Sequence, residues 1–313
     1  MQGVVDGFAT ILLVIAAGAL VAHLRVVDEA GRRVLSRVAF TVASPALMVV
    51  VLADADVSRL FTGYVAAIAA GVVVTATTYA CLARWVFRRD LAGGVVGTLC
   101  TGYVNAGNLG LPVAAYVLGD AALMAPVLLL QMLVLQPVAL ALLDRAAAER
   151  RPSALRLLTT PVRNPITVGA LTGLTLNLTG LRLPVALGAP LDLVAGMAVP
   201  TMLLAFGVSL RLGPLPGRGT SAPELAVITV LKTLVQPGVA LLVAGPVLGL
   251  APGDVLAAAV ISALPAAQNV FVVAARYDTG PGPGSALLAA RDAVSTTTLV
   301  SVPVMVGLAA LLG

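Results

Sequence analysis

The chain has 313 residues, of which 59% are hydrophobic and 11% are charged, and its mean hydropathy is +1.04. Soluble domains carry roughly 25% charged residues, so this composition excludes a soluble enzyme or binding domain and indicates a polytopic membrane protein. The formal net charge of +5 does not indicate a nucleic-acid partner, because the basic residues lie between apolar segments and form no single patch.

Ten apolar segments follow one another along the chain, and each is long enough for a membrane-spanning helix. The longest polar stretch between them, residues 144–163, leaves no room for a soluble domain. The first segment has no cleavage signal and is expected to be a retained helix. The expected spans are about residues 4–24, 34–53, 61–86, 91–118, 121–143, 165–181, 185–210, 225–248, 254–276 and 285–312.

The arginines between spans lie mostly on one side of the membrane. The loops after the odd-numbered spans hold most of them, whereas the opposite loops hold Arg59 and Arg182. The positive-inside rule therefore predicts a protein of the cytoplasmic membrane with both termini outside. The arginine-rich side comprises Arg25, Arg32, Arg33, Arg37, Arg84, Arg88, Arg89, Arg145, Arg150, Arg151, Arg156, Arg163, Arg211, Arg218 and Arg276.

The fourth span contains residues that do not suit a continuous helix. Its centre holds Asn105, Gly107, Asn108, Gly110 and Pro112. Pro112 lacks a backbone N–H and the two glycines allow non-helical dihedrals, so we expect the helix to break here. Irregular backbone at membrane depth is tolerated only where protein or a wet cavity surrounds it, so this segment predicts a binding site.

The second half of the chain repeats the first. Pro45 in the second span corresponds to Pro200 in the seventh, and Pro112 in the fourth corresponds to Pro265 in the ninth. Five spans in each half is an odd number, so the halves are expected to be inverted, as in many secondary transporters. The predicted divisions are a first five-helix repeat over residues 1–143, a cytoplasmic linker over 144–163 and a second repeat over 164–313.

The ninth span carries two amides, Gln268 and Asn269, just after Pro265. At about 1.5 Å per residue, Pro265 lies roughly 17 Å from the outer end of its span and Asn105 roughly 18 Å from the inner end of its own. Both interruptions therefore fall near the midplane. If the segments cross, the N-termini of half-helices and the amide donors would together suit an anion. Alternatively, the amides serve only to bond backbone groups that the breaks leave free.

Lys232 lies about eight residues into the eighth span, roughly 12 Å along the helix. It is either a cation that contributes to an anion site or a lysine whose ammonium reaches the inner interface along apolar surface. Gln131 and Gln136 are either ligands or sources of hydrogen bonds between helices. Arg291 and Asp292 are expected to form an interfacial ion pair or a gate.

On these residues the chain resembles the auxin efflux carrier family, which in bacteria includes malate and malonate permeases. The likeness covers essentially the whole chain and is strongest at residues 105–112, NAGNLGLP, which is similar to the family's Asn-Thr-Gly-x-x-Gly-x-Pro segment with Ala106 in place of Thr. It continues at Asn164-Pro165, at Pro200 with residues 206–210, and over residues 264–277. The resemblance implies an all-α fold of ten helices in two inverted five-helix repeats. It also implies broken fourth and ninth helices that cross at their prolines, a homodimer and the carriage of organic anions.

The sequence therefore predicts an alternating-access transporter of small organic anions, such as malate, malonate or auxin-like acids, and not an enzyme. No cofactor, metal site or nucleic-acid partner is expected, and the partners are the anion, membrane lipid and a second copy of the chain. The substrate is expected between the crossing and spans two, three, seven and eight. The candidate substrate-binding residues are Asn105, Asn108, Gln268, Asn269 and Lys232, and the helix-break residues are Gly107, Gly110, Pro112 and Pro265.

Functions of other classes fit the sequence less well. An intramembrane hydrolase needs a metal cluster, a pair of acids or a nucleophile with its base, and the chain has a single histidine, His23, near the end of the first span. A sodium/proton antiporter needs a carboxylate at the crossing, and neither break contains one. A sodium-coupled organic anion symporter of the bile-acid-transporter type remains the alternative, because carbonyl and amide oxygens can hold sodium without an acid.

Overall fold

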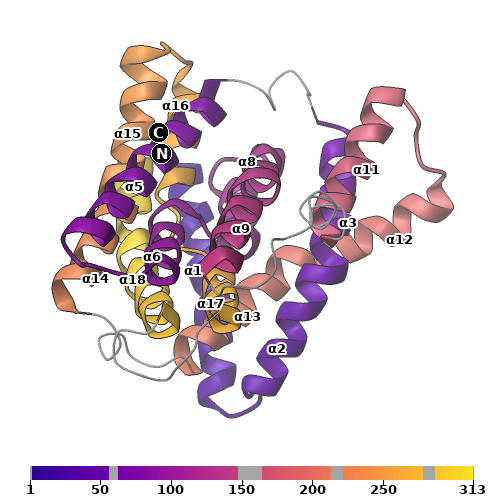
Figure 1. Ribbon diagram of the computed structural model, residues 1–313. Helices are drawn as coiled ribbons and strands as arrows, with labels where there is room; N and C mark the ends of the chain where they lie inside the picture. The colour runs from indigo at the N-terminus through magenta and orange to yellow at the C-terminus, as the bar shows by residue number, and fades with distance from the viewer. Residues whose placement is uncertain (1, 56–62, 147–163, 213–220, 278–285, 313) are drawn as a thin grey trace.

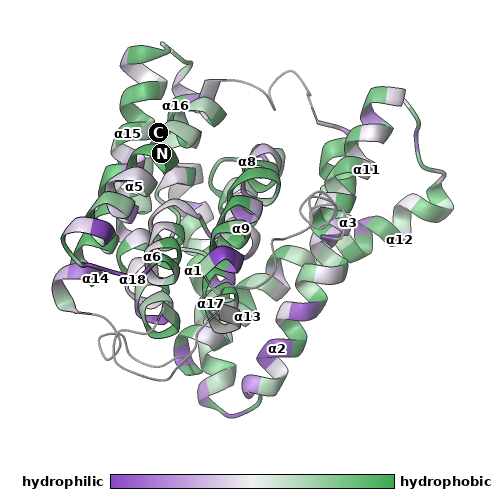
Figure 2. Cartoon of the chain, viewed as in Figure 1, coloured by the Kyte–Doolittle hydropathy of each residue, from purple (hydrophilic) through white to green (hydrophobic). Residues whose placement is uncertain are grey.

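The structure, a computed structural model, describes residues 2–55, 63–146, 164–212, 221–277 and 286–312 (Figure 1). Every regular element in these ranges is helical, which confirms the predicted all-α class. Most of the linker 144–163 lies outside the described residues, as do Arg59, Arg150, Arg151, Arg156, Arg163 and Arg218. Figure 2 shows hydrophobic residues along most of the helical surface and hydrophilic residues gathered mainly on α2 (Glu29–Val38) and near helix ends.

Seven helices in the described ranges are long and apolar enough to cross a membrane. They cover Asp6–His23, Glu29–Ala53, Gly63–Trp85, Ala121–Ala146, Val185–Leu212, Ala222–Val247 and Ala286–Leu312. Three of the ten expected spans are therefore not long continuous helices. The sixth is the 15-residue α11 (Pro165–Thr179), which Asn164 caps and Gly180 ends with a φ of 68°. The fourth and ninth are interrupted, as expected.

The elements follow one another in the order below. The first half comprises α1 (Gln2–His23), α2, η1 (Ala39–Ala43), α3 (Ser44–Ala53), α5 (Gly63–Trp85), α6 (Leu91–Gly102), η2 (Ala106–Gly110), α7 (Leu111–Tyr116), η3 (Ala121–Met124), α8 (Ala125–Leu130), η4 (Gln131–Leu135) and α9 (Gln136–Ala146). The second half comprises α11, α12 (Val185–Gly196), α13 (Ala198–Leu212), α14 (Ala222–Val230), η5 (Leu231–Val235), α15 (Gln236–Leu242), η6 (Val243–Val247), α16 (Pro252–Ser262), α17 (Gln268–Tyr277) and α18 (Ala286–Leu312).

The helices pack in two groups, and Figure 1 shows α3, α11 and α12 of one group on the opposite side of the molecule from α5, α15 and α16 of the other. In one group, α1 packs on α13 while α11 and α12 pack on α3. In the other, the interrupted helices α6 and α16 pack on α5, α15 and α18. The expectation that spans three and eight would lie across the substrate from the interrupted helices is therefore wrong. These spans, α5 and α14–α15, belong to the same group as the interruptions.

Glycines explain which helices associate. A Cβ atom at Gly207 of α13 would lie 2.0 Å from the Ile15 carbonyl oxygen of α1, and one at Gly169 of α11 would lie 2.4 Å from the Pro45 carbonyl oxygen of α3. In the other group, a Cβ at Gly71 of α5 would lie 2.8 Å from the carbonyl oxygen of α15 at position 236. Without a hydrophobic driving force between helices in lipid, such close backbone contact is the main source of packing energy.

We expect Gly207→Ala to destabilise the protein, because the added methyl group would collide with backbone that cannot move aside cheaply. Overpacking of this kind costs about 1–3 kcal/mol. The matched control is Gly196→Ala in α12, where an added Cβ has no atom within 4 Å. Thermal melting in detergent should show a lower transition for Gly207→Ala only, and equal transitions for the two variants would contradict the packing described here.

Candidate functional site

The two interrupted helices meet at their breaks. Val104 pairs with Ala266 in an antiparallel bridge, which two hydrogen bonds form: the Asn105 N–H donates to the Pro265 carbonyl at 2.8 Å, and the Ala267 N–H donates to the Tyr103 carbonyl at 3.2 Å. These bonds satisfy polar groups that an interrupted helix would otherwise leave unpaired away from water. Each interruption is therefore the hydrogen-bonding partner of the other.

The first interruption does not coincide with Pro112. It lies between α6 and η2, at residues 103–105, and Pro112 is the second residue of α7, after the π-helical turn η2. The π-helical turn continues into α7 with helical dihedrals at Gly110 and Leu111, so the proline is accommodated beside this turn without a break. Gly107 and Gly110 lie within η2, after the break. Pro265, by contrast, lies within the second interruption, between α16 and α17.

Asn105 starts the second half of its interrupted helix. Its side-chain oxygen accepts from the Asn108 backbone N–H at 3.3 Å, as a helix N-cap does. Its side-chain nitrogen is buried and has no hydrogen-bond partner in the part of the chain that the structure describes. The Asn105 side-chain oxygen therefore caps the backbone, and the side-chain nitrogen remains available as a donor.

The other amides link the interrupted helices to each other and to the group that contains α13. The Asn108 Nδ2 donates to Gln268 Oε1 at 3.3 Å, and the Gln268 Nε2 donates to Ser209 Oγ at 3.1 Å. Ser209 lies on α13, in the group formed by α1, α3 and α11. Residues from both halves of the chain and both helical groups thus meet at the interruptions.

A small cavity of about 20 Å³ lies beside these amides. Asn105, Asn108 and Asn269 line it, together with Gln131 of η4, whose side-chain oxygen is buried and has no partner among the described residues. One water needs about 10–15 Å³ of such volume, so the cavity as it stands holds little more than a water molecule. A buried donor and a buried acceptor left unsatisfied cost about 1–3 kcal/mol each, which favours their use by a bound ligand or water.

The remaining wall of the cavity is uncharged. It includes Phe40 of η1 and Ile166 of α11 from one group, and Leu128 and Met132 from the fifth span. Each of these positions was an apolar residue of a predicted span, and nothing in the sequence distinguished it from the rest of its helix. The group that contains α1, α3, α11 and α13 therefore supplies part of an apolar wall to the cavity that the amides line.

Lys232 lies apart from this cavity. Its side chain is fully buried, and its Nζ donates to Gln236 Oε1 at 2.6 Å. The Gln236 Nε2 in turn points to the Gly102 carbonyl oxygen, 3.4 Å away, at the end of α6. The interpretation in which the Lys232 amino group reaches an interface is therefore wrong. Its connection to the first interruption runs through Gln236, which the sequence analysis did not single out.

A buried acid also escaped the sequence analysis. Glu224 of α14 is only 2% exposed, and its Oε1 accepts from the Tyr79 hydroxyl at 2.7 Å and from Arg89 Nε at 2.9 Å. The hydrogen bond to Glu224 raises the pKa of the Arg89 guanidinium. An acid at the start of an apolar span indicates that it needs a partner, but the sequence does not identify Tyr79 and Arg89 as that partner. Arg291 and Asp292 form the expected ion pair, with Nη2 and Oδ1 2.9 Å apart.

We expect Lys232→Met to lower the melting temperature, because the fully buried Gln236 oxygen would lose its donor. An unsatisfied buried group of this kind costs about 1–3 kcal/mol, whereas replacing both partners by apolar groups of similar shape can be nearly neutral. The double variant Lys232→Met/Gln236→Leu should therefore recover much of the loss in a detergent melting experiment. A single Lys232→Met variant that melts like the unmodified protein would show that the bond between Lys232 and Gln236 contributes nothing to stability.

Two comparisons with known proteins bear on this site. A profile of the family described as membrane transport protein matches residues 4–306 of the chain. The chain is also 27% identical over 239 residues to a protein of Methanothermobacter thermautotrophicus described as an uncharacterized transporter. That alignment covers 75% of this chain and 76% of the relative.

Proposed function

Since the chain belongs to the membrane transport protein family, which confirms its resemblance to the auxin efflux carriers, we propose that it carries small organic anions by alternating access. It is a multi-pass membrane transporter and not an enzyme. The proposal goes further in naming the substrate class, the binding site and the mechanism. The proposal also includes two inverted repeats over residues 1–143 and 164–313, crossing of the interrupted helices and a homodimer. These three features rest on the family resemblance.

The observation that carries the proposal is the Asn105 donor, which has no partner among the described residues, beside a small cavity at the junction of the interruptions. The Asn105 Nδ2 lies where η2 begins, and Gln268 begins α17. Helix N-termini present free N–H groups and a positive partial charge, which favour a carboxylate over a cation. Asn108 and Asn269 add amide groups to the same space. The lining residues are neutral, so we expect helix ends and amides to hold the anion, without a salt bridge.

The two groups of helices support a mechanism in which the substrate is held between them. The amides come from the interrupted helices, whereas Phe40 and Ile166 come from the opposite group. At about 20 Å³ the cavity is too small for an organic acid, so the groups have to separate on one side for substrate to enter. Separation on alternate sides would expose the same amides to each face of the membrane in turn.

Lys232 has a supporting role in this proposal. Its bond to Gln236, which points to the end of α6, lets it fix the position of the first interruption without touching the substrate. We therefore treat Lys232 as a positioning residue, whereas Asn105, Asn108, Gln268 and Asn269 are the proposed binding residues.

We expect Asn105→Asp to abolish or strongly weaken anion binding while the protein stays folded. The substitution keeps the oxygen that caps η2 but replaces the unpaired donor with a second oxygen that repels anions. The loss of one hydrogen bond to a charged group corresponds to about 10- to 150-fold in affinity. Binding of labelled malate, malonate and an indole carboxylate to purified protein, with and without sodium, measures this effect.

The matched control is Asn177→Asp on α11. The Asn177 Nδ2 donates to the carbonyls of Ala53 and Ala55, at 2.9 and 2.8 Å, and does not line the cavity. This variant should melt at a lower temperature and keep its affinity. Unchanged affinity in Asn105→Asp would show that the site is elsewhere. Binding that requires sodium in the unmodified protein would favour the sodium-coupled symporter.

The orientation gives a separate prediction, because arginines such as Arg84, Arg88 and Arg211 lie on the side expected to be cytoplasmic. A cysteine placed at residue 313 should react with a membrane-impermeant thiol reagent in intact cells. A cysteine placed at residue 151 should react only after the membrane is opened. The reverse pattern would overturn the proposed topology.

A further inference from the structure

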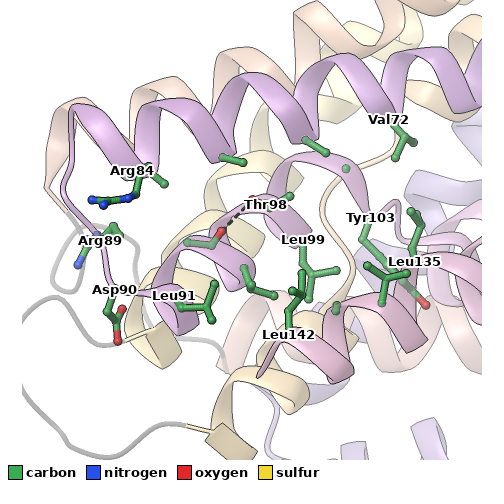
Figure 3. Close-up of a pocket in the computed structure, with 18 of the residues that line it drawn as sticks. Val72, Arg84, Arg89, Asp90, Leu91, Thr98, Leu99, Tyr103, Leu135 and Leu142 are labelled. Carbon is green, nitrogen blue, oxygen red and sulfur yellow. Dashed lines mark hydrogen bonds between the residues drawn. The ribbon is translucent and has the colours of Figure 1, made fainter. Parts of the chain in front are cut away.

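A second and much larger cavity lies beside the first half of the interrupted fourth span, α6, on the surface of the helical bundle. It is a groove of about 710 Å³ bounded by α5, α6 and the η4–α9 segment (Figure 3). Small residues of α5 and α6, among them Ala76, Ala80 and Gly94, make room for it. Its far wall is formed by Val134, Val138 and Leu142, whose side chains are 49%, 55% and 40% exposed. The groove is therefore open to the surroundings of the helical bundle, which for this protein are lipid.

The two ends of the groove differ in charge. Figure 3 shows Arg84, Arg89 and Asp90 at one end and Val72, Tyr103 and Leu135 at the other. The Asp90 carboxylate accepts from the Gly93 N–H at 2.9 Å and so caps α6. Arg89 pairs with Glu224, which is buried. Arg89 neutralises Glu224, whereas the exposed Asp90 carboxylate keeps its negative charge. Arg84 is exposed and forms no ion pair with a described residue, so it is the cation that this end of the groove offers to a headgroup.

The charged end also lies at the level expected of lipid headgroups. Trp85, the last residue of α5, is 73% exposed beside Arg84. Tryptophans and arginines at the end of a membrane-spanning helix mark the boundary between headgroups and acyl chains. The apolar part of the groove extends from that boundary along α5 and α6 toward the membrane interior.

We propose that this groove is a binding site for an anionic phospholipid, with an acyl chain along the apolar part and the headgroup at Arg84. A volume of 710 Å³ lies within the range of about 300–1,000 Å³ that is usual for small-molecule sites. The orientation proposed above places Arg84, and with it the headgroup, in the cytoplasmic leaflet; the lipid site itself does not rest on that orientation. A carried acid is a less suitable occupant, because the groove is open along its side to lipid.

The inner end of the groove gives the lipid a route to influence transport. Gly102, the last residue of α6, and Tyr103, in the interruption, line this end. Tyr103 also lines the small cavity beside Asn105, so this residue borders both spaces. An acyl chain that fills the groove would restrict movement of the Tyr103 ring and of the break itself. We therefore expect transport to depend on the anionic lipid content of the membrane.

Native mass spectrometry of the purified full-length protein tests the site. The protein would be titrated with phosphatidylglycerol and, separately, with phosphatidylcholine of the same acyl chains. We expect tighter binding of phosphatidylglycerol, and an affinity for it that falls about fivefold in Arg84→Gln, since one basic residue near a membrane surface contributes about that factor. Ala80→Phe, which fills the groove and keeps every charge, should remove the bound lipid.

Arg88→Gln is the matched control. Arg88 lies four residues after Arg84, beyond the end of α5, and is exposed, but it does not line the groove. Its loss should leave the affinity for phosphatidylglycerol unchanged. Equal binding of the two lipids, or binding that neither Arg84→Gln nor Ala80→Phe changes, would overturn the proposal. Displacement of the bound lipid by a soluble carboxylate would assign the groove to the carried anion instead. None of these outcomes depends on the Asn105 site, so the two proposals fail separately.

Discussion

The structure depends on one constraint: a broken helix inside a membrane must find partners for its backbone polar groups. Here each break supplies them for the other, through the bridge between Val104 and Ala266 and the two hydrogen bonds that form it. Because irregular backbone is otherwise too costly at this depth, the two interruptions stabilise each other. They also bring two helix N-termini and several amides together. The candidate site follows from this backbone pairing, to which the side chains are then added.

The sequence predicts features that depend on local chemistry and misses those that depend on distant partners. The interruptions are predictable, because glycine, proline and asparagine at the centre of an apolar segment do not suit a helix. The exact break in the fourth span was predicted too near Pro112, because the π-helical turn η2 places this proline in a position that a helix tolerates. The grouping of spans three and eight was wrong, because α5 packs on α6 and α15 packs on α16, and the sequence does not show which helices associate in this way.

The same distinction applies to the buried polar residues. Asn105, Asn108 and Asn269 could be found from their positions in the interrupted spans, and the structure places all three at the cavity. The roles of Gln236 and Glu224 could not be assigned in this way. Glu224 bonds to Tyr79 and Arg89 and Gln236 bonds to Gly102, and all three partners come from other segments of the chain. The position of Lys232 at membrane depth was clear from the sequence. Which way its side chain turns depends on Gln236, one helical turn further along.

Asn108, Gln268 and Ser209 already hydrogen-bond to one another, and a bound ligand would compete with these internal bonds. In the proposed mechanism, a carboxylate that binds to Gln268 has to displace an internal partner, so the exchange yields only a small net gain. A carrier has to release what it binds on every cycle, and a modest affinity shortens the time that each anion stays bound. Ser209 belongs to the opposite group of helices, so displacing it also removes a bond that holds the groups together. Occupancy of the site would in this way lower the barrier to the movement that empties it.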